Sequence, residues 1–282
     1  MNIKVMSDKE YKETHKKICL RKEVKISIKL LLLGLGALQK INEANDFYHL
    51  PFLLLSSGFE RLMKCIICYK YYKEKKKFPG LKEIKGNTNG HDLIYLKNKV
   101  KDCISKSIAS KREATKKDYE YISNDKDLDK LIGVLSKFGQ YARYYNFDIV
   151  IGKGSPKDNV EVSWQNYEFE LIKDKKDLII AYKNNEYRVY EYINKQIIIK
   201  LEKLARALVR QFTLGDLGNE AKTNTKVIDP FLALKDNELG KRDYYEYFQN
   251  YNLMNGRKRK DGKTGVIFHF FRQLIFSFKL DK

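Results

Sequence analysis

The sequence predicts a mainly α-helical protein, and three observations support this fold class. Only four prolines occur in 282 residues, so little interrupts long helices. Apolar residues recur at three- and four-residue spacing over several long stretches, which is the period of an amphipathic helix. Hydrophobic residues make up 43% of the chain and charged residues 33%, a balance typical of a folded protein with a sizeable core. We therefore expect a helical core.

The N-terminal half is predicted to form a series of helices separated by polar loops. Pro51 suits the first turn of the second long helix, and the segment between Phe78 and Gly90 is rich in turn residues. The stretch from Lys111 to Lys130 is highly charged and expected to be exposed. The expected helices cover residues 11–20 (a short lead-in), 24–45, 51–77, 92–108 and 128–145.

The segment from Gly152 to Pro156 is the best candidate for a domain boundary. It would divide the chain into a helical domain of residues 1–155 and a mostly helical C-terminal extension of residues 156–282. Short alternating patterns predict strands at residues 160–164 and within 177–192, a helix is expected over 192–214, and residues 221–242 are rich in loop signals. Residues 266–278 fit a buried strand or a buried helix equally.

The formal charge of +20 points to polyanionic partners. The first 155 residues hold 32 of the 56 lysines and arginines, which favours RNA or anionic nucleotides as ligands. A basic stripe follows one face of the helix expected at 192–214 and would suit a row of phosphates; it consists of Lys200, Lys203, Arg206 and Arg210. The alternative is that these lysines and arginines solvate helix faces without binding anything.

The four cysteines do not form a pattern typical of a disulfide framework, so we expect a reducing, cytoplasmic setting. Cys65 and Cys68, with His91 and Cys103, have the residue types of a zinc site. However, positions i and i+3 of a helix share a face, which favours two small core residues, and no metal or other cofactor is expected. The apolar run at 30–38 is far shorter than the roughly 20 residues that span a bilayer, so we expect no membrane segment.

Three short motifs carry a resemblance to a known family. The second expected helix contains Glu60-Arg61-x-x-Lys64, the third begins with Gly90-His91-Asp92-Leu93, and the fourth ends in Arg143-Tyr144. This arrangement resembles the HEPN superfamily over about residues 24–148, although Tyr145 stands where some members have proline. The resemblance implies an antiparallel bundle of four or five helices, usually a homodimer, in toxins and phage-defence proteins. Many members cut RNA without a metal.

The usual HEPN catalytic dyad, Arg-x(4–6)-His, is absent from this chain. None of its histidines, His15, His49, His91 and His269, follows an arginine at that spacing. A non-standard catalytic site would combine His91 as acid or base with Arg61 and Arg143 as phosphate-stabilising groups. The alternative for His91 and Asp92 is a helix cap with no catalytic role.

The remaining candidate residues suit binding to RNA or a nucleotide. Tyrosines stack on bases, and Asn and Arg contact base edges or phosphates. The predicted binding residues are Glu60, Lys64, Asp92, Tyr144, Tyr145, Asn146 and Asp148. Two other hypotheses remain open: a non-catalytic sensor that holds a nucleotide or a partner chain, and a C-terminal half that docks a protein partner.

Overall fold

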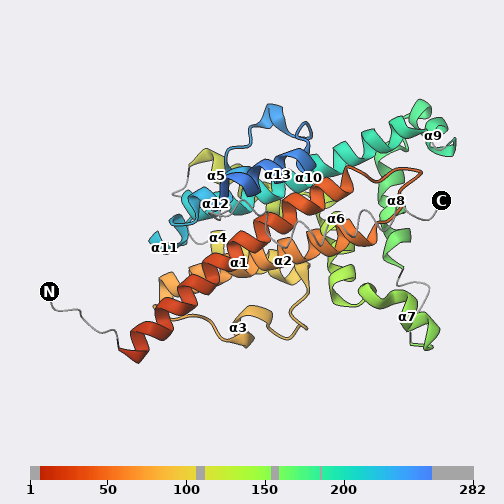
Figure 1. Cartoon of the computed structure of the whole chain (residues 1–282). Helices are drawn as coiled ribbons and strands as arrows, with labels where there is room; N and C mark the ends of the chain where they lie inside the picture. The colour runs from red at the N-terminus through yellow and green to blue at the C-terminus, as the bar shows by residue number, and fades with distance from the viewer. Residues whose placement is uncertain (1–6, 106–111, 154–158, 185, 256–282) are drawn as a thin grey trace, which may run out of the picture. The chain divides into compact units, whose positions relative to one another are not determined.

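The structure, a computed structural model, describes residues 7–105, 112–153, 159–184 and 186–255 of the chain. Within these ranges the chain forms α-helices and short 3₁₀ turns, with one isolated bridge between Asn42 and Asn45 and no strand (Figure 1). The protein is therefore mainly α-helical, as predicted. The chain divides into two units, Met1–Phe248 and Gln249–Lys282. Residues 266–278, for which strand and helix were both expected, lie outside the described residues.

Two long helices form a tightly packed hairpin at the start of the first unit, α1 (Asp8–Leu38) and α2 (His49–Lys75). A Cβ at Gly34 would lie 2.8 Å from Leu55 Cγ, and one at Gly58 would lie 2.9 Å from Leu31 Cγ. Leu31 precedes Gly34 on α1, whereas its neighbour Gly58 follows Leu55 on α2. The two helices therefore run antiparallel. The absent side chains of Gly34 and Gly58 allow this close approach.

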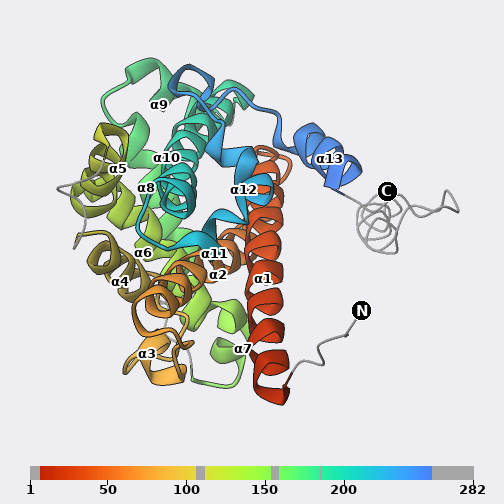
Figure 2. The same cartoon turned by 90° about the vertical axis from the view of Figure 1, so that its left-hand side faces the viewer.

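The remaining helices of the first unit pack around this hairpin (Figures 1 and 2). They are α3 (Leu81–Lys85), α4 (Leu93–Ser105), α5 (Glu113–Asn124), α6 (Lys126–Gln140), α7 (Tyr145–Val150), α8 (Val160–Ile172), α9 (Lys176–Lys183), α10 (Tyr187–Thr213), α11 (Asn219–Lys222) and α12 (Thr225–Leu232), with 3₁₀ turns η2 (Ala142–Tyr144) and η4 (Asp236–Glu238). Helix α13 (Tyr244–Asn255) begins in the first unit and continues into the second.

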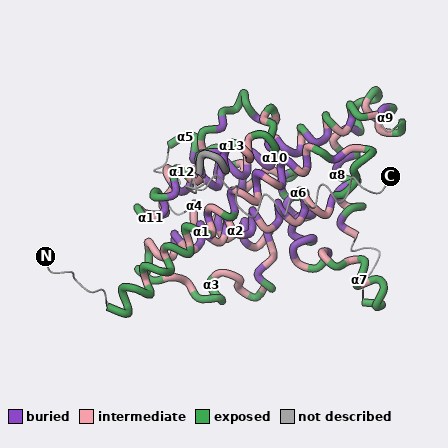
Figure 3. Tube along the Cα trace, in the orientation of Figure 1, coloured by how far each residue is buried: buried purple, intermediate pink, exposed green. Residues whose placement is uncertain are grey.

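The buried core runs through α1, α2, α6 and α10 (Figure 3). Helix α10 packs against α1, α2 and α5. Helices on both sides of the predicted boundary at 152–156 thus share one core, and the predicted boundary lies within the first compact unit. Among the described residues, no helix is long and apolar enough to cross a bilayer.

The two predicted strands are wrong. Residues 160–164 begin α8, residues 177–183 belong to α9, and residues 187–192 begin α10. Asn159 caps α8, because its Oδ1 accepts hydrogen bonds from the backbone N–H groups of Glu161 (2.9 Å) and Val162 (3.3 Å). Val162 is 50% exposed, whereas Val160 and Trp164 are buried. The alternating residues therefore form the start of a helix. A segment of five residues is too short to distinguish the helical period from the alternation of a strand.

Several predicted boundaries also differ from the structure. The lead-in helix and the first long helix are one helix, α1, which Ser7 and Glu10 cap and which ends at Leu38, not near residue 45. The helix expected over 128–145 ends at Gln140, after which the chain turns through η2 into α7. Residues 113–124 form α5, whose Thr115, Asp118 and Ile122 are buried, so this charged stretch is only partly exposed. Residues 221–242 include the end of α11, together with α12 and η4.

Candidate functional site

The structure brings together three of the predicted site residues, because Lys64 and His91 both contact the carboxylate of Glu60. Glu60 on α2 is 9% exposed. Its Oε1 accepts a hydrogen bond from Lys64 Nζ at 2.7 Å, and its Oε2 lies 2.9 Å from His91 Nδ1. Because a carboxylate only accepts, Nδ1 carries the proton in this pair. The His91 side chain is 44% exposed in this cluster.

Asp92 lies next to this cluster and caps α4. Asp92 Oδ1 accepts hydrogen bonds from the backbone N–H of Tyr95 (3.0 Å) and from Ser136 Oγ (3.2 Å). Ser136, on α6, in turn accepts a hydrogen bond from the backbone N–H of Leu93 at 2.9 Å. These contacts satisfy N–H groups that a helix start otherwise leaves without partners. The geometry thus matches the capping alternative for Asp92.

Arg61 and Arg143, the two other predicted catalytic residues, lie elsewhere. Arg61 follows Glu60 on α2 but forms an ion pair with Glu23 on α1, since successive residues of a helix point about 100° apart. Arg143 lies in the turn η2 and lines a pocket whose lining includes neither His91 nor Arg61. The structure therefore distributes the three predicted catalytic side chains over different surroundings.

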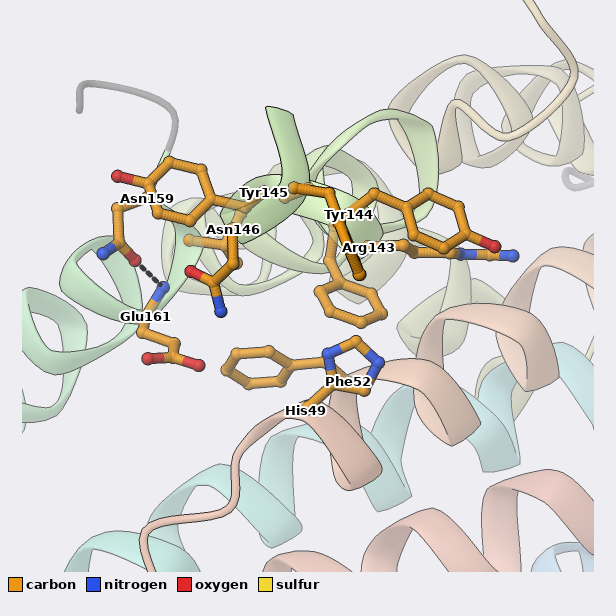
Figure 4. A pocket seen from close by; sticks show the side chains of 12 residues that line it. His49, Phe52, Arg143, Tyr144, Tyr145, Asn146, Asn159 and Glu161 are labelled. Atoms are coloured by element: carbon orange, nitrogen blue, oxygen red, sulfur yellow. Dashed lines mark hydrogen bonds between the residues drawn. The ribbon is translucent and has the colours of Figure 1, made fainter. Parts of the chain in front are cut away.

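The pocket gathers four of the predicted residues and has a volume of about 320 Å³. It lies where the start of α2, the end of α6, the η2–α7 turn and the start of α8 meet (Figure 4). Its lining consists of His49, Phe52, Phe138, Ala142, Arg143, Tyr144, Tyr145, Asn146, Phe147, Asn159, Val160 and Glu161. Asp148, also predicted to bind, follows on α7 but is not part of the lining.

An aromatic cluster forms the floor of the pocket. The ring of His49 meets Phe138 edge-on at a centroid distance of 5.0 Å, and Phe52 contacts Phe138 at 5.6 Å. Trp164, which is fully buried, packs behind Phe52 at 4.8 Å. These contacts hold the His49 ring against the aromatic floor, where it forms part of the lining.

Polar groups converge on this floor from the η2–α7 turn and from α8. In Figure 4, Asn146 and His49 point into the same space from opposite sides, and Glu161 borders it. Arg143 Nε is buried and makes no hydrogen bond, whereas Tyr144 is 68% exposed. The pocket therefore offers cationic, amide and aromatic groups to a ligand.

His49 was missed at the level of sequence. Its position in the first turn of a helix is ordinary, and nothing near it in the sequence suggests a binding role. It joins Arg143 and Asn146 because the start of α2 packs against the end of α6, as the contact with Phe138 shows. That crossing depends on tertiary packing, so no local signal identifies this residue.

A buried acid lies one layer behind the pocket. Glu168 on α8 is 1% exposed. It accepts hydrogen bonds from Trp164 Nε1 (2.8 Å) and Tyr48 OH (3.1 Å). Burial raises the pKa of its carboxyl group to about 7, while these two hydrogen bonds partly oppose the rise. The layer behind the pocket thus contains an acid whose pKa lies close to neutral pH.

Two of the three cysteines considered as zinc ligands, Cys65 and Cys68, lie on α2, where Cys65 is buried and Cys68 partly buried. Burial raises the pKa of Cys65 well above its ordinary value and that of Cys68 to about 11. Both thiols are therefore less acidic than an exposed cysteine. Within the described residues no group of His, Cys, Asp or Glu side chains is placed to hold a metal ion.

The fold and the pocket together define an all-helical protein with an aromatic and polar surface pocket. Comparisons with protein-family models, with curated proteins and with solved structures gave no match.

Proposed function

We propose that this protein binds RNA or a nucleotide in the pocket lined by His49 and residues 143–146. The observation that carries the proposal is that one pocket is lined by four successive residues, Arg143, Tyr144, Tyr145 and Asn146. The pocket has a volume of about 320 Å³, which is at the lower end of the range for ligand pockets. Arg143 contacts a phosphate, the tyrosines stack on a base, and Asn146 bonds a base edge. The net charge of +20 supports attraction of such a ligand.

The resemblance to HEPN proteins supports a role in phage defence or as a toxin, in the cytoplasm. The four cysteines are all free, which agrees with a reducing compartment. A homodimer is also part of this proposal. Exposed apolar side chains at and after α7 supply a surface for a second copy: Phe147, Val150 and Ile151 are 68%, 80% and 59% exposed. A protein partner of the C-terminal half stays a prediction.

Binding of a fluorescent single-stranded RNA, followed by anisotropy, tests the proposal. Tyr144→Ala is expected to weaken binding by roughly 5- to 150-fold, since stacking on one base contributes about 1–3 kcal/mol. Arg143→Gln should weaken binding as well, through loss of a phosphate contact. Tyr187→Ala is the matched control, because Tyr187 is 58% exposed on α10, outside the pocket. Equal affinities for the wild type and both pocket variants would refute binding at this pocket.

Metal-independent cleavage of RNA is a second candidate, and the presence of His49 and Arg143 in the lining of one pocket favours it. An imidazole accepts the proton of a ribose 2′-hydroxyl as that oxygen attacks the adjacent phosphorus. The bond from phosphorus to the 5′-oxygen then breaks, giving a 2′,3′-cyclic phosphate, and the leaving 5′-oxygen takes a proton from water to become a free 5′-hydroxyl. Arg143 stabilises the charge on the phosphate in the transition state. This arrangement uses His49 in the role that the sequence suggested for His91.

Incubation of RNA with the protein in the presence of EDTA separates these possibilities. Cleavage that His49→Ala and Arg143→Ala abolish, while His91→Ala leaves it intact, would support catalysis in the pocket. Cleavage lost in His91→Ala and Arg61→Ala would instead support the site predicted from the sequence. Intact RNA with retained binding identifies a non-catalytic binding or sensing module.

A further inference from the structure

A second pocket, of about 510 Å³, lies between α5 and α10, outside the proposed RNA-binding site. Four cationic and three acidic side chains take part in its lining, which is made up of Glu113, Ala114, Lys117, Asp118, Tyr121, Lys203, Arg206, Arg210 and Asp236. Lys203, Arg206 and Arg210 share one face of α10, because residues three and four positions apart are neighbours on a helix. Lys200, the fourth member of the predicted basic stripe, instead lies 3.2 Å from Asp127 and does not line the pocket.

Arg206 is held rigidly in this pocket but uses only part of its guanidinium group. The residue is 7% exposed. Its Nη1 donates a hydrogen bond to the backbone oxygen of Leu234 at 3.1 Å, and its Nη2 donates one to Asp236 Oδ1 at 2.6 Å. Nε is buried and makes no hydrogen bond. The edge formed by Nε and Nη2 suits two oxygens of one anion, yet a single carboxylate oxygen occupies it.

Asp236 is a replaceable partner for this edge. Its side chain is 86% exposed on the turn η4, so its departure costs little burial. By contrast, Asp118 is a fixed element of the pocket: its side chain is 8% exposed and accepts a hydrogen bond from Arg210 Nη1 at 3.1 Å. An incoming anion would therefore displace Asp236 and leave the pair of Arg210 and Asp118 in place. Lys203 and Lys117 line the same pocket and add positive charge to it.

We propose that this pocket binds the terminal phosphoryl group of a small phosphorylated ligand, with two phosphoryl oxygens on Arg206 Nε and Nη2 in place of the Asp236 carboxylate. A terminal phosphoryl group carries close to two negative charges at neutral pH, which suits two lysines beside a guanidinium. A continuous RNA strand suits the pocket less well, since its phosphates would pass the carboxylates of Glu113 and Asp118. The inference is independent of RNA binding at the first pocket.

Calorimetric titration of the full-length protein with inorganic pyrophosphate at constant ionic strength tests this site. The wild type is expected to bind saturably. Lys203→Gln and Lys117→Gln should each weaken binding by roughly tenfold, as expected for the loss of one charge-assisted contact. Asp236→Asn should strengthen binding, because it removes the competing charge while it keeps a side chain of the same size. This gain distinguishes the proposed site from a purely structural ion pair.

Lys195→Gln is the matched control, because Lys195 is exposed on the same helix and does not line the pocket. It should bind pyrophosphate like the wild type, and so should Tyr144→Ala in the first pocket. The proposal would be overturned by the absence of saturable binding, by an Asp236→Asn variant that binds no more tightly than the wild type, or by equal losses in the Lys195 and Lys203 variants. Displacement of pyrophosphate by an RNA lacking terminal phosphates would overturn the assignment to a small ligand.

Discussion

Buried carboxylates in this protein differ in whether their hydrogen-bond donors are cations or neutral groups. Glu60 accepts hydrogen bonds from Lys64 and His91, and Asp118 is paired with Arg210. Glu168 accepts its hydrogen bonds from Trp164 and Tyr48, neither of which carries a positive charge. Hydrogen bonds from neutral donors compensate burial of a carboxylate less fully than a cation does. Burial raises the pKa of Glu168 to about 7, with only neutral donors to oppose the rise, and it also raises the pKa of Asp118, where the charge of Arg210 opposes it.

The stability of the protein should therefore depend on pH through Glu168. Its pKa is about 7 in the folded protein against an ordinary value of 4.5. The folded state thus holds a proton that the unfolded chain has lost, and the free energy of unfolding falls as pH rises from about 4.5 to about 7. The expected loss is about 3 kcal/mol, complete slightly above pH 7. Urea unfolding at pH 5 and pH 8 measures it.

Glu168→Gln keeps the size and an acceptor oxygen but cannot ionise. This variant should lose the contribution of Glu168 to the pH dependence, so that it gains stability relative to the wild type between pH 5 and pH 8. Glu161→Gln, on the exposed side of the same helix, controls for general effects of charge. Parallel pH profiles for the wild type and Glu168→Gln would contradict the interpretation.

Helix pairs in this fold are positioned by contacts that only particular residues allow. Ser136 on α6 satisfies the first N–H of α4 and also bonds the cap residue Asp92, which aligns the two helices. The α1–α2 hairpin depends instead on an absent side chain at Gly58, opposite Leu31. In α6, by contrast, a Cβ at Gly133 would meet nothing within 4 Å.

Two glycine-to-alanine substitutions should therefore change stability in opposite directions. Gly133→Ala is expected to stabilise the protein by about 0.5–1 kcal/mol, because alanine favours a helix over glycine. Gly58→Ala gains the same preference but places its Cβ against Leu31, and overpacking costs about 1–3 kcal/mol, so we expect a net loss of roughly 1 kcal/mol. Denaturant midpoints of both variants test this. Stabilisation by Gly58→Ala would contradict the prediction and would show that Leu31 moves aside at little cost.

At the scale of the whole molecule, charge and core are organised separately. The core that α10 shares with α1 and α2 joins distant parts of the chain, whereas the surplus of 56 lysines and arginines over 36 acids gives the surface its net charge of +20. A positive surface attracts a polyanion but does not define where the polyanion binds. The first pocket would supply the defined binding site.

Affinity for RNA should therefore fall steeply with salt. Each phosphate contact releases condensed counterions, so the logarithm of the binding constant decreases linearly with the logarithm of the salt concentration. Between 50 and 200 mM salt we expect a loss of at least about tenfold. Anisotropy titrations at four salt concentrations measure the slope, which Arg143→Gln should reduce and Tyr144→Ala should leave unchanged. A slope near zero would exclude an interface dominated by phosphates.

Long periodic stretches were predictable, and short ones were not. The helices expected at 51–77 and 192–214 correspond to α2 and α10, since each repeats the helical spacing over many turns. The five residues at 160–164 cannot distinguish a strand from the first turn of a helix, and there the prediction was wrong. Candidate residues adjacent in the sequence, such as 143–146, stayed together in the pocket, whereas Arg61 and His91 have separate surroundings.

The sequence by itself determined the fold class, the strong positive charge and the local groups of candidate residues, because composition and helical period are properties of neighbouring residues. Tertiary structure alone decided that His49 lines the same pocket as Arg143 and Asn146, that Arg61 pairs with Glu23, and that Arg206 has a bonding edge held by Asp236. Each of these contacts joins residues far apart in the chain. Their proximity depends on how helices cross, and crossing angles follow from the packing of side chains along whole helices.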